Sequence, residues 1–508
     1  MIPEAAEAAE AVLSLGALLE GFANTQGLGA IRITGLELDS RRVSPGSLFV
    51  ALKGHQVHGL TFAPVACEKG CAAVLFDPQD AGDWRIAERD SNVPWIEVPD
   101  LASHLGCIAS RYFGQPSRTM KVVAITGTNG KTSCSHFLAE ALGAGAGVLG
   151  TLGWGAPGAL TETQNTTSDA VATQRLLAAL LEQGFGTVVM EASSHGLHQG
   201  RMNGVALAGV VLTNFSRDHL DYHGTMEAYL EAKLRLLSWE NLGFIAFNAE
   251  SPFREPVIGS PRPGCRRIGF ARQGFEMDGL DALVTYGDVE FLTEGLRFTL
   301  TQGAASRRVT LPLFGEFNVE NVAATVAALM GMGHAFEQAV AHLDRLKPVP
   351  GRMEQVAWGG RHAVIDYAHT PDALASVLGS VRKHCEGALW VVFGCGGDRD
   401  TGKRALMGRA VEQFADHMVI TDDNPRSECG EKIIEDIRAG LVAKEPLVIR
   451  NRREAIATAI RALRPRDLAV IAGKGHETYQ EVAGISHPFS DREVARDVMH
   501  QLHPFVLQ

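Results

Sequence analysis

The sequence predicts an α/β protein of three domains: a small α/β domain, a central domain with a mainly parallel sheet, and a C-terminal doubly wound domain. Two observations support this prediction. The 508 residues exceed what one hydrophobic core usually organises. Short apolar runs also alternate with helical patterns along most of the chain, which is typical of parallel sheets covered by helices. The predicted domains span residues 1–117, 118–346 and 347–508.

The first predicted domain consists of short apolar runs separated by turn residues. The runs predicted as strands are Ile31–Leu38, Leu48–Leu52, Ala72–Phe76 and Trp95–Val98. Leu101–Tyr112 has the spacing of a helix. Residues 114–117 read Gly-Gln-Pro-Ser, which is typical of a linker to the next domain.

The other two domains show longer alternation of strand and helix patterns. In the central domain the predicted strands are Val122–Ile125, Thr187–Met190 and Val205–Leu212, and the predicted helices are Thr132–Leu142, Thr173–Gln183 and Asn318–Met330. Alternating residues near Asp288–Thr310 predict a short antiparallel excursion. The strands predicted in the C-terminal domain are His362–Ile365, Leu389–Phe393, His417–Ile420, Leu447–Ile449 and Leu468–Ala472. A doubly wound sheet binds its ligands at the carboxyl ends of the strands.

Composition argues against several classes of partner. The net charge of −11 comes from interspersed acidic and basic residues, so neither a nucleic acid nor an anionic membrane surface is expected to bind. Met1–Glu10 lacks the features of a secretory signal, and no apolar run is long enough to span a membrane. Eight cysteines are sparse, with Cys67 and Cys71 the only close pair, so we expect inert thiols in a reducing cytoplasm.

The most informative motif follows the predicted strand Val122–Ile125. It reads TGTNGKT over Thr126–Thr132 and opens a predicted helix. Glycines let backbone N–H groups surround phosphate oxygens, and a helix N-terminus adds partial positive charge. The usual spacing would place the first glycine at Ile125, so we interpret the motif as a variant phosphate-binding loop. In such a loop Lys131 reaches the β- and γ-phosphates, and the Thr132 hydroxyl ligates Mg²⁺.

Acidic and imidazole side chains follow the next strands of the same predicted sheet. Glu191 comes directly after the run Thr187–Met190, and His219 lies seven residues beyond Leu212. Successive strands of a parallel sheet end at the same edge, so these side chains are expected near the phosphate loop. We therefore predict Glu191 and His219 as metal ligands.

These residues resemble the Mur ligases, a family of ATP-dependent enzymes that form amide bonds in peptidoglycan precursor synthesis. The matching segments run in order along nearly the whole chain. After the phosphate loop they are Glu191–Gly196 (EASSHG), Asp218–Gly224 (DHLDYHG), Gly315–Asn321 (GEFNVEN), Gly351–Glu354 (GRME), Asp366–Pro371 (DYAHTP), Gly394–Lys403 (GCGGDRDTGK), Asp423–Arg426 (DNPR) and Gly473–Glu477 (GKGHE).

The resemblance implies a division of substrates among the three domains, which would bind a UDP-sugar peptide, ATP and the incoming amino acid in that order. The residues implied to contact the UDP-sugar peptide are Leu38, Ser40, His55, Gln56, Val57, Asn165, Thr166, Thr167, Ser193, Gln199 and Arg201. Those implied to contact ATP are Gly127, Thr128, Asn129, Gly130, Lys131, Thr132, Ser133, Asn318, Arg352 and Asp366.

The resemblance also implies the chemistry. A substrate carboxylate takes the γ-phosphoryl group of ATP, and an amine attacks the resulting acyl phosphate to form an amide. The implied catalytic residues are Lys131, His219 and Lys233, the last as a carbamate that joins Thr132, Glu191 and His219 as a ligand of Mg²⁺. Its own sequence context predicts Lys233 as a solvated helix residue, so only the resemblance assigns this role.

The loop Asp423–Arg426 bears on which amine is added. In the family this tetrapeptide marks enzymes that add meso-2,6-diaminopimelate, rather than L-lysine, to UDP-N-acetylmuramoyl-L-alanyl-D-glutamate. Diaminopimelate carries a distal carboxylate that a guanidinium binds in a two-pronged manner, whereas the ammonium of lysine would be repelled by Arg426. The residues implied to contact diaminopimelate are Arg399, Asp423, Asn424, Pro425, Arg426, Gly473 and Glu477.

Three alternatives stay open at this point. They are the lysine-adding ligase of the same step, a folylpolyglutamate-type ligase that shares the fold, and a kinase or nucleotide-gated protein without ligase activity. Under the favoured hypothesis the partners are small molecules only, namely the UDP-sugar dipeptide, ATP and diaminopimelate, and we expect a cytoplasmic monomer that uses Mg²⁺.

Overall fold

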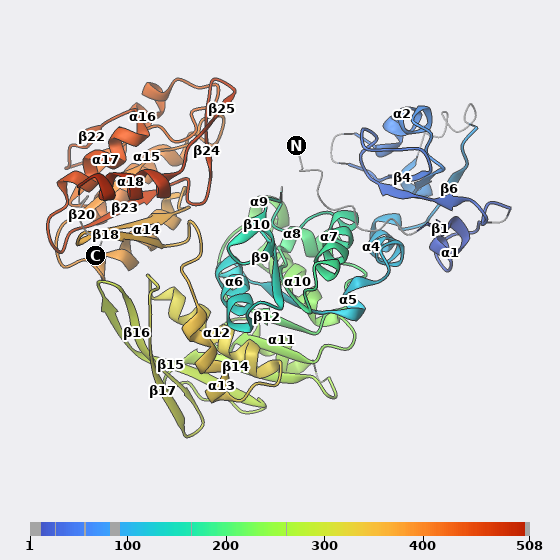
Figure 1. Ribbon diagram of the computed structural model, residues 1–508, viewed down its shortest axis with the longest axis horizontal. Coiled ribbons are helices and arrows are strands. Elements are labelled where there is room, and N and C mark those ends of the chain that lie inside the picture. Colours follow the sequence, from blue (N-terminus) through green and yellow to red (C-terminus); the bar gives the residue numbers. More distant parts are fainter. Residues whose placement is uncertain are drawn as a thin grey trace. The chain divides into compact units, whose positions relative to one another are not determined.

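The computed structural model describes residues 12–25, 27–54, 57–81, 92–163, 165–260 and 262–502 (Figure 1). The chain divides into two compact units. The first comprises residues 1–271, 276–283 and 324–339, and the second comprises residues 272–275, 284–323 and 340–508. The predicted α/β class is confirmed. Within the described ranges, none of the helices combines the length and the apolar character that crossing a bilayer requires.

The N-terminal sheet of the first unit is small and entirely parallel, with the order β3-β4-β5-β6. Alternate residues of its strands face opposite sides, and both sides are buried: Leu48 and Val50 belong to one apolar cluster and Phe49 to another. The strands are β3 (Gly35–Glu37), β4 (Ser47–Ala51), β5 (Ala73–Phe76) and β6 (Trp95–Glu97). The other elements of this region are β1 (Leu13–Ser14), α1 (Leu15–Leu19), β2 (Arg32–Ile33), α2 (Ala63–Glu68), α3 (Pro78–Ala81) and α4 (Leu101–Tyr112).

Two predictions for this region are wrong in detail. The predicted strand Ile31–Leu38 is broken, because β2 and β3 belong to different sheets and the Thr34 N–H between them donates to the Gly46 carbonyl (3.0 Å). The predicted linker at residues 114–117 runs into α5 (Pro116–Thr119), and both Pro116 and Ser117 are buried. Proline favours the first turn of a helix, which explains why this linker ends in one.

The central sheet of the first unit places the phosphate loop among parallel strands. Within this unit the strand order is β10-β9-β8-β11-β7-β12-β13-β14, parallel from β8 to β14 and extended by antiparallel β9 and β10. The strands are β7 (Lys121–Thr126), β8 (Ala146–Gly150), β9 (Gly153–Ala156), β10 (Ala159–Thr161), β11 (Thr187–Glu191), β12 (Gly209–Leu212), β13 (Phe244–Asn248) and β14 (Arg266–Arg272). The helices of this stretch are α6 (Lys131–Leu142), α7 (Ala170–Glu182), α8 (Ser194–His198), α9 (Leu220–His223), α10 (Met226–Leu234) and α11 (Arg254–Gly259), and α12 (Phe317–Gly331) and α13 (Phe336–Ala341) follow later in the chain.

One central strand was predicted too long. The prediction Val205–Leu212 includes the buried residues Val205 and Leu207, but β12 begins only at Gly209. The Ala206 N–H donates to the Ser117 hydroxyl oxygen (2.9 Å) and not to a neighbouring strand. The apolar residues before Gly209 therefore look like a strand in the sequence, although the Ala206 N–H is not part of the sheet's hydrogen bonding.

The second unit contains a six-stranded sheet of order β18-β19-β23-β20-β21-β22, parallel except for β18. One face packs against an apolar cluster that includes Leu374, Met407 and Ile433, and the other against a cluster that includes Ile456 and Val494. The sheet strands are β18 (Glu354–Trp358), β19 (Arg361–Asp366), β20 (Leu389–Phe393), β21 (His417–Ile420), β22 (Leu447–Val448) and β23 (Leu468–Ala472). The helices are α14 (Pro371–Arg382), α15 (Lys403–Phe414), α16 (Gly430–Arg438), α17 (Arg452–Ala462) and α18 (Asp491–Leu502).

Two antiparallel ribbons complete the second unit. The predicted excursion near Asp288–Thr310 is confirmed as β15 (Ala282–Leu292), β16 (Gly295–Gln302) and β17 (Ala305–Leu311). A hairpin of β24 (Tyr479–Val482) and β25 (Ile485–Pro488) follows the carboxyl end of β23. Its first strand contributes to the polar cluster described below.

Candidate active site

The phosphate loop is held in shape by the segment that follows the neighbouring strand. β7 ends at Thr126 and α6 begins at Lys131, so residues 127–130 form the connection. The N–H groups of Thr128 and Asn129 donate to the backbone and side-chain oxygens of Asn214 (both 2.8 Å), and the Thr213 hydroxyl donates to the Asn129 carbonyl (2.7 Å). Thr213 and Asn214 thus hold the phosphate loop in place through hydrogen bonds.

Lys131 curls back over this loop. Its Nζ donates to the carbonyls of Gly127 (3.0 Å) and Thr128 (2.9 Å). Gly130 precedes the helix with φ of 84°, a conformation that favours glycine. The ammonium and the N-terminus of α6 therefore place positive charge together, as binding of a triphosphate requires.

Gly127→Ala is expected to weaken ATP binding at least about tenfold, because a methyl group there cannot be accommodated by small shifts. A Cβ at this position would lie 1.8 Å from the Thr213 hydroxyl oxygen and 3.0 Å from the Asn214 backbone nitrogen. Calorimetric titration with ATP measures the effect. Gly145→Ala is the matched control, because its Cβ would meet nothing within 4 Å; equal affinities for the two variants would contradict the prediction.

Glu191 is buried at the end of β11, where it bonds the helix that follows the phosphate loop. Its Oε2 accepts from the Thr132 hydroxyl (2.9 Å) and from the Thr151 hydroxyl (3.1 Å), and its Oε1 accepts from the Thr151 N–H (2.8 Å). Thr151 was absent from the predicted residues. A carboxylate beside a threonine hydroxyl is an oxygen donor set of the kind that Mg²⁺ prefers, so the residues present fit that ion.

His219 lies near the same edge. Its backbone is left-handed (φ 52°), and its ring centroid lies 4.9 Å from that of His195 and 5.8 Å from that of Tyr229. Burial lowers the pKa of His219 from its usual value, against the opposing effect of Asp218. A neutral imidazole keeps a lone pair, which a metal ligand needs.

Lys233 is the clearest disagreement with expectation from sequence context. The prediction of a solvated residue is wrong: the side chain is 1% exposed, and its Nζ donates to the Gly127 carbonyl (2.8 Å) and lies 4.5 Å from the Tyr229 ring centroid. Burial, followed by the nearby charge of Lys131, lowers the pKa of Lys233 to about 6. This shift favours the uncharged, nucleophilic form of the amine.

Several residues implied to bind the acceptor peptide lie around the N-terminus of α8. The Thr167 hydroxyl donates to the Glu191 carbonyl (2.9 Å) and accepts from the Ser193 N–H (3.0 Å), while Arg201 donates to the Thr167 carbonyl (2.8 Å) and to Gln199 Oε1 (2.8 Å). Thr166 joins them through Thr151 (3.0 Å). This part of the predicted set is one connected network.

The other predicted acceptor contacts are not part of that network. Leu38 and buried Ser40 follow β3, and Val57 and Asn165 are exposed. His55 and Gln56 lie outside the described residues.

The remaining nucleotide residues belong to the second unit. Asp366, at the end of β19, is buried and accepts from the N–H groups of Met353 and Ala368 (both 2.8 Å); burial raises the pKa of Asp366, and Arg352 opposes that shift. The Arg352 guanidinium lies 5.1 Å from the Tyr367 ring centroid. Asn318 is buried, donates to the Phe314 carbonyl (2.7 Å) and accepts from Asn321 (2.9 Å).

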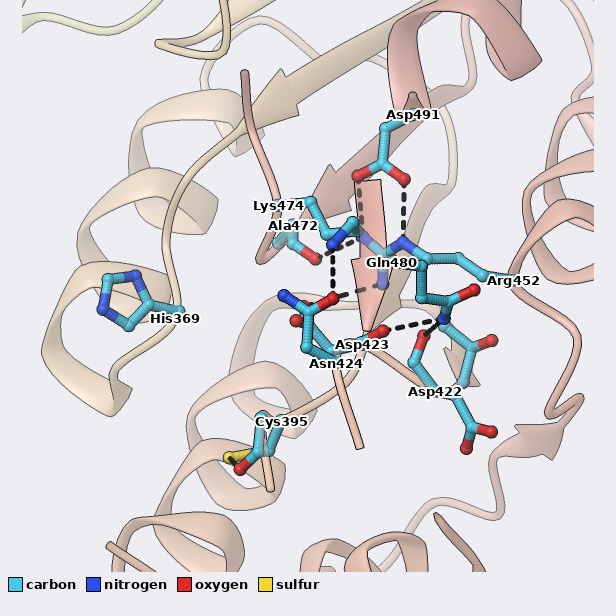
Figure 2. A network of polar contacts seen from close by, with 12 residues as sticks. His369, Cys395, Asp422, Asp423, Asn424, Arg452, Ala472, Lys474, Gln480 and Asp491 are labelled. Carbon is cyan, nitrogen blue, oxygen red and sulfur yellow. Dashed lines mark hydrogen bonds and ion pairs between the residues drawn. The ribbon is translucent and has the colours of Figure 1, made fainter. Parts of the chain in front are cut away.

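A second polar cluster occupies the carboxyl end of the sheet in the second unit (Figure 2). Asn424 donates through Nδ2 to Glu477 Oε2 (2.9 Å), and Lys474 Nζ donates to Asn424 Oδ1 (2.9 Å) and to Glu477 Oε2 (2.8 Å). Gln480 of β24 donates to the Asp423 carbonyl (2.7 Å). The structure thus brings Asp423, Asn424 and Glu477 together, and adds Lys474, which the sequence reasoning did not single out.

A buried ion pair between Arg452 and Asp491 lies next to Asp423 of this cluster. Arg452, at the start of α17, donates to both carboxylate oxygens of Asp491 (2.7 Å each) and to the Ala472 carbonyl (3.0 Å), as Figure 2 shows. Its Nη1 lies 3.9 Å from Asp423 Oδ2. Gly473 has φ of 118°, and a Cβ there would lie 2.3 Å from the same Asp423 oxygen. Glycine at 473 therefore lets Asp423 approach.

Arg426 ends the Asp423–Arg426 loop with a left-handed backbone (φ 51°). Its Nη1 donates to the Gly397 carbonyl (2.7 Å), and its Nε pairs with Glu481 (3.2 Å). The Pro425 carbonyl also lies so close to Gly397 that a Cβ added at Gly397 would be 2.0 Å from the carbonyl oxygen. Arg399 is exposed and makes no hydrogen bond to these described residues.

Comparison with protein families gives three consecutive matches. Residues 32–113 match the model described as "Mur ligase family, catalytic domain", residues 125–329 match "Mur ligase middle domain", and residues 351–475 match "Mur ligase, glutamate ligase domain".

Individual relatives match over most of the chain. The chain is similar to the UDP-N-acetylmuramoyl-L-alanyl-D-glutamate–2,6-diaminopimelate ligases of Alkalilimnicola ehrlichii (46% identity, covering 91% of this chain and 93% of the relative) and Chromobacterium violaceum (44%, covering 91% and 94%). A solved structure of a ligase of the same name is 35% identical, with a TM-score of 0.71, covering 97% of this chain and all of that one. The MurF ligase of Thermotoga maritima in complex with ADP shares the fold (16% identity, TM-score 0.58, covering 92% and 96%). The chain therefore belongs to the Mur ligase family.

Proposed function

We propose that this chain joins meso-2,6-diaminopimelate to the D-glutamyl carboxylate of UDP-N-acetylmuramoyl-L-alanyl-D-glutamate, with ATP as co-substrate, in peptidoglycan precursor synthesis. The observation that carries the proposal is the loop Asp423–Arg426, held beside Lys474 and Glu477 in a chain whose relatives bear the name of that ligase. ATP and UDP-linked precursors are cytoplasmic metabolites, so the proposed place is the cytoplasm.

The first chemical step activates the carboxylate. Its oxygen attacks the γ-phosphorus, the bond to the β-phosphate oxygen breaks, and ADP leaves an acyl phosphate behind. Lys131 and the N-terminus of α6 are set to stabilise the negative charge on the phosphoryl oxygens during this transfer. Thr167, Ser193, Gln199 and Arg201 would orient the acceptor peptide.

The second step forms the amide. The uncharged amine of diaminopimelate attacks the acyl carbon, the bond to the phosphate oxygen breaks, inorganic phosphate leaves, and the amine loses its proton to solvent. Glu477 and Arg426 would hold the distal end of the amino acid, through its ammonium and its carboxylate respectively. Arg426 would also disfavour L-lysine, which presents a cation where diaminopimelate presents a carboxylate.

Mg²⁺ is proposed to accompany ATP at Thr132, Glu191 and His219. The ion would supply positive charge that offsets the phosphates. We also propose that Lys233 reacts with carbon dioxide: its neutral amine forms an N–C bond to the carbon and releases a proton, which yields a carbamate whose single negative charge is shared by two oxygens. The buried position and lowered pKa of Lys233 support this modification, since only the neutral amine is nucleophilic.

One assay tests the proposal against its alternatives. The protein is incubated with ATP, Mg²⁺ and the UDP-sugar dipeptide, with meso-diaminopimelate or L-lysine side by side, and both phosphate and the UDP-sugar product are quantified. We expect product with diaminopimelate at a kcat/KM at least about a hundredfold above that with lysine. A preference for lysine would reassign the amine. Phosphate release without the dipeptide or an amine would favour a kinase or nucleotide-gated protein.

A further inference from the structure

Lys474 is a fully buried lysine in the polar cluster that also contains Asn424 and Glu477. Its side chain has 0% exposure, although lysine is almost never fully buried unless it is paired. Its Nζ donates to Asn424 Oδ1 (2.9 Å) and Glu477 Oε2 (2.8 Å), and it lies 5.4 Å from the Tyr479 ring centroid. Asn424 lies in the loop Asp423–Arg426, Glu477 lies in the loop after β23, and Tyr479 is the first residue of β24.

The Lys474 ammonium, together with the Glu481 N–H, sets which way the Asn424 amide points. Asn424 Oδ1 accepts from Lys474 and also from the Glu481 N–H (2.9 Å), so two donors fix the oxygen on that side. The amide nitrogen is thereby directed at Glu477 Oε2 (2.9 Å). A flipped amide would set its NH₂ group against both donors, which is unfavourable at a buried site.

The same ammonium orients Glu477. Oε2 of this carboxylate receives two donors, Lys474 Nζ and Asn424 Nδ2, and the side chain is 18% exposed. This leaves Oε1 as the oxygen that can accept from a ligand ammonium. Lys474 therefore helps to set the direction of two side chains of the proposed amine site, Asn424 and Glu477.

We propose that Lys474 is the positioning residue of the amine-substrate site: it orients Asn424 and Glu477 for the distal ammonium of diaminopimelate and does not contact the reacting atoms. This inference rests on the proposed function. In the ion pair nearby, Arg452 donates hydrogen bonds to Asp491 and to the Ala472 carbonyl. Lys474, in contrast, bonds side chains of the site itself.

Lys474→Met tests the proposal, because methionine keeps the length and the apolar stem while removing the three N–H donors. We expect KM for diaminopimelate to rise at least about twentyfold, with kcat reduced less than about threefold and KM for ATP and for the UDP-sugar dipeptide unchanged. Positional isotope exchange in labelled ATP, measured with the dipeptide and no amine, should keep its wild-type rate. KM values of all three substrates moving together, or an unchanged KM for diaminopimelate, would overturn the assignment.

The control is Arg382→Met. Arg382 also pairs with an aspartate, Asp416 (2.7 Å), and donates to the Cys385 carbonyl (3.0 Å). Arg382 precedes β20 and Asp416 precedes β21, so this pair lies at the amino ends of the strands and not at their carboxyl ends. We expect Arg382→Met to lower the melting temperature without changing KM for diaminopimelate. A rise in that KM equal to the rise in Lys474→Met would show that general destabilisation, and not positioning, explains the effect.

A double-mutant cycle with Glu477→Gln shows whether Lys474 acts through Glu477. In the Glu477→Gln background, Lys474→Met should raise KM for diaminopimelate clearly less than it does in the wild type, because the carboxylate that it orients is gone and only its contact to Asn424 remains to be lost; additive effects would contradict the proposal. Should Lys474→Met fail to fold, Lys474→Gln, which keeps an amide donor, is measured instead, with KM expected between wild type and Glu477→Gln. A wild-type enzyme that makes no diaminopimelate product would refute the proposed function, whereas an active wild type with an unaffected variant would refute only the role of Lys474.

Discussion

Lys233→Ala is expected to lower kcat by about two to three orders of magnitude, the range seen when one preorganised charged group is removed from a phosphoryl-transfer or acyl-transfer site. The alanine variant loses the proposed carbamate and therefore an anionic oxygen ligand beside the phosphate loop. Steady-state kinetics measure the change. Lys121→Ala is the control, because Lys121 is exposed at the start of β7; a similar loss in both variants would contradict a special role for Lys233.

The carbamate also predicts a pH dependence. Burial lowers the pKa of Lys233 to about 6, so the neutral amine that reacts with carbon dioxide predominates as pH rises above that value and disappears as pH falls below it. With ¹³C-labelled bicarbonate, a carbamate signal is expected at about pH 7.5 and should be lost at about pH 5. The signal should be absent from Lys233→Ala at either pH. Its persistence in that variant would assign it to another amine.

Arg426→Ala is expected to raise KM for diaminopimelate about a hundredfold or more and to reduce the discrimination against L-lysine, because a two-pronged charged contact to a carboxylate is lost. Arg426→Lys should fall between wild type and alanine, since lysine keeps the charge without the planar fork. Kinetics with both amino acids measure these effects. An unchanged KM for diaminopimelate would show that Arg426 does not bind the distal carboxylate.

The backbone at this position requires its own control. Arg426 has φ of 51°, where alanine is strained and glycine is not. Arg426→Gly removes the same guanidinium without that strain. Both variants should raise KM for diaminopimelate alike; a near-normal KM in the glycine variant would assign the effect to the loop conformation.

The strands buried on both faces were the most predictable part of the fold. The predictions for β20, β21 and β23 coincide with the structure, because each is an apolar run bounded by polar or turn residues. Among the parallel strands of the central sheet, β8, β13 and β14 were missed; β8 is rich in glycine, and β14 carries arginines at both ends. In both, position in the sheet prevails over local strand preference. β12 shows the converse error, since Val205 and Leu207 are buried but lie in the segment that precedes the strand.

For the site, the motifs located the loops but not the side chains that support them. Thr213 and Asn214 hold the phosphate loop, yet a threonine-asparagine pair after a strand is too common to signal this role. The burial of Lys233 depends on packing beneath the phosphate loop, which helix spacing alone does not reveal. Arg452 and Asp491 meet only in the tertiary structure, so no local pattern could have paired them.

That buried pair links the proposed amino-acid site to α18. Asp491 is the first residue of α18, and separating it from Arg452 would leave an unpaired charge in the core. Arg452 in turn lies against the carbonyl that precedes Gly473 and against Asp423. Local unfolding of α18, by fraying or by proteolysis, is therefore expected to disrupt the proposed amino-acid site, while the phosphate loop of the first unit would keep its own hydrogen bonds.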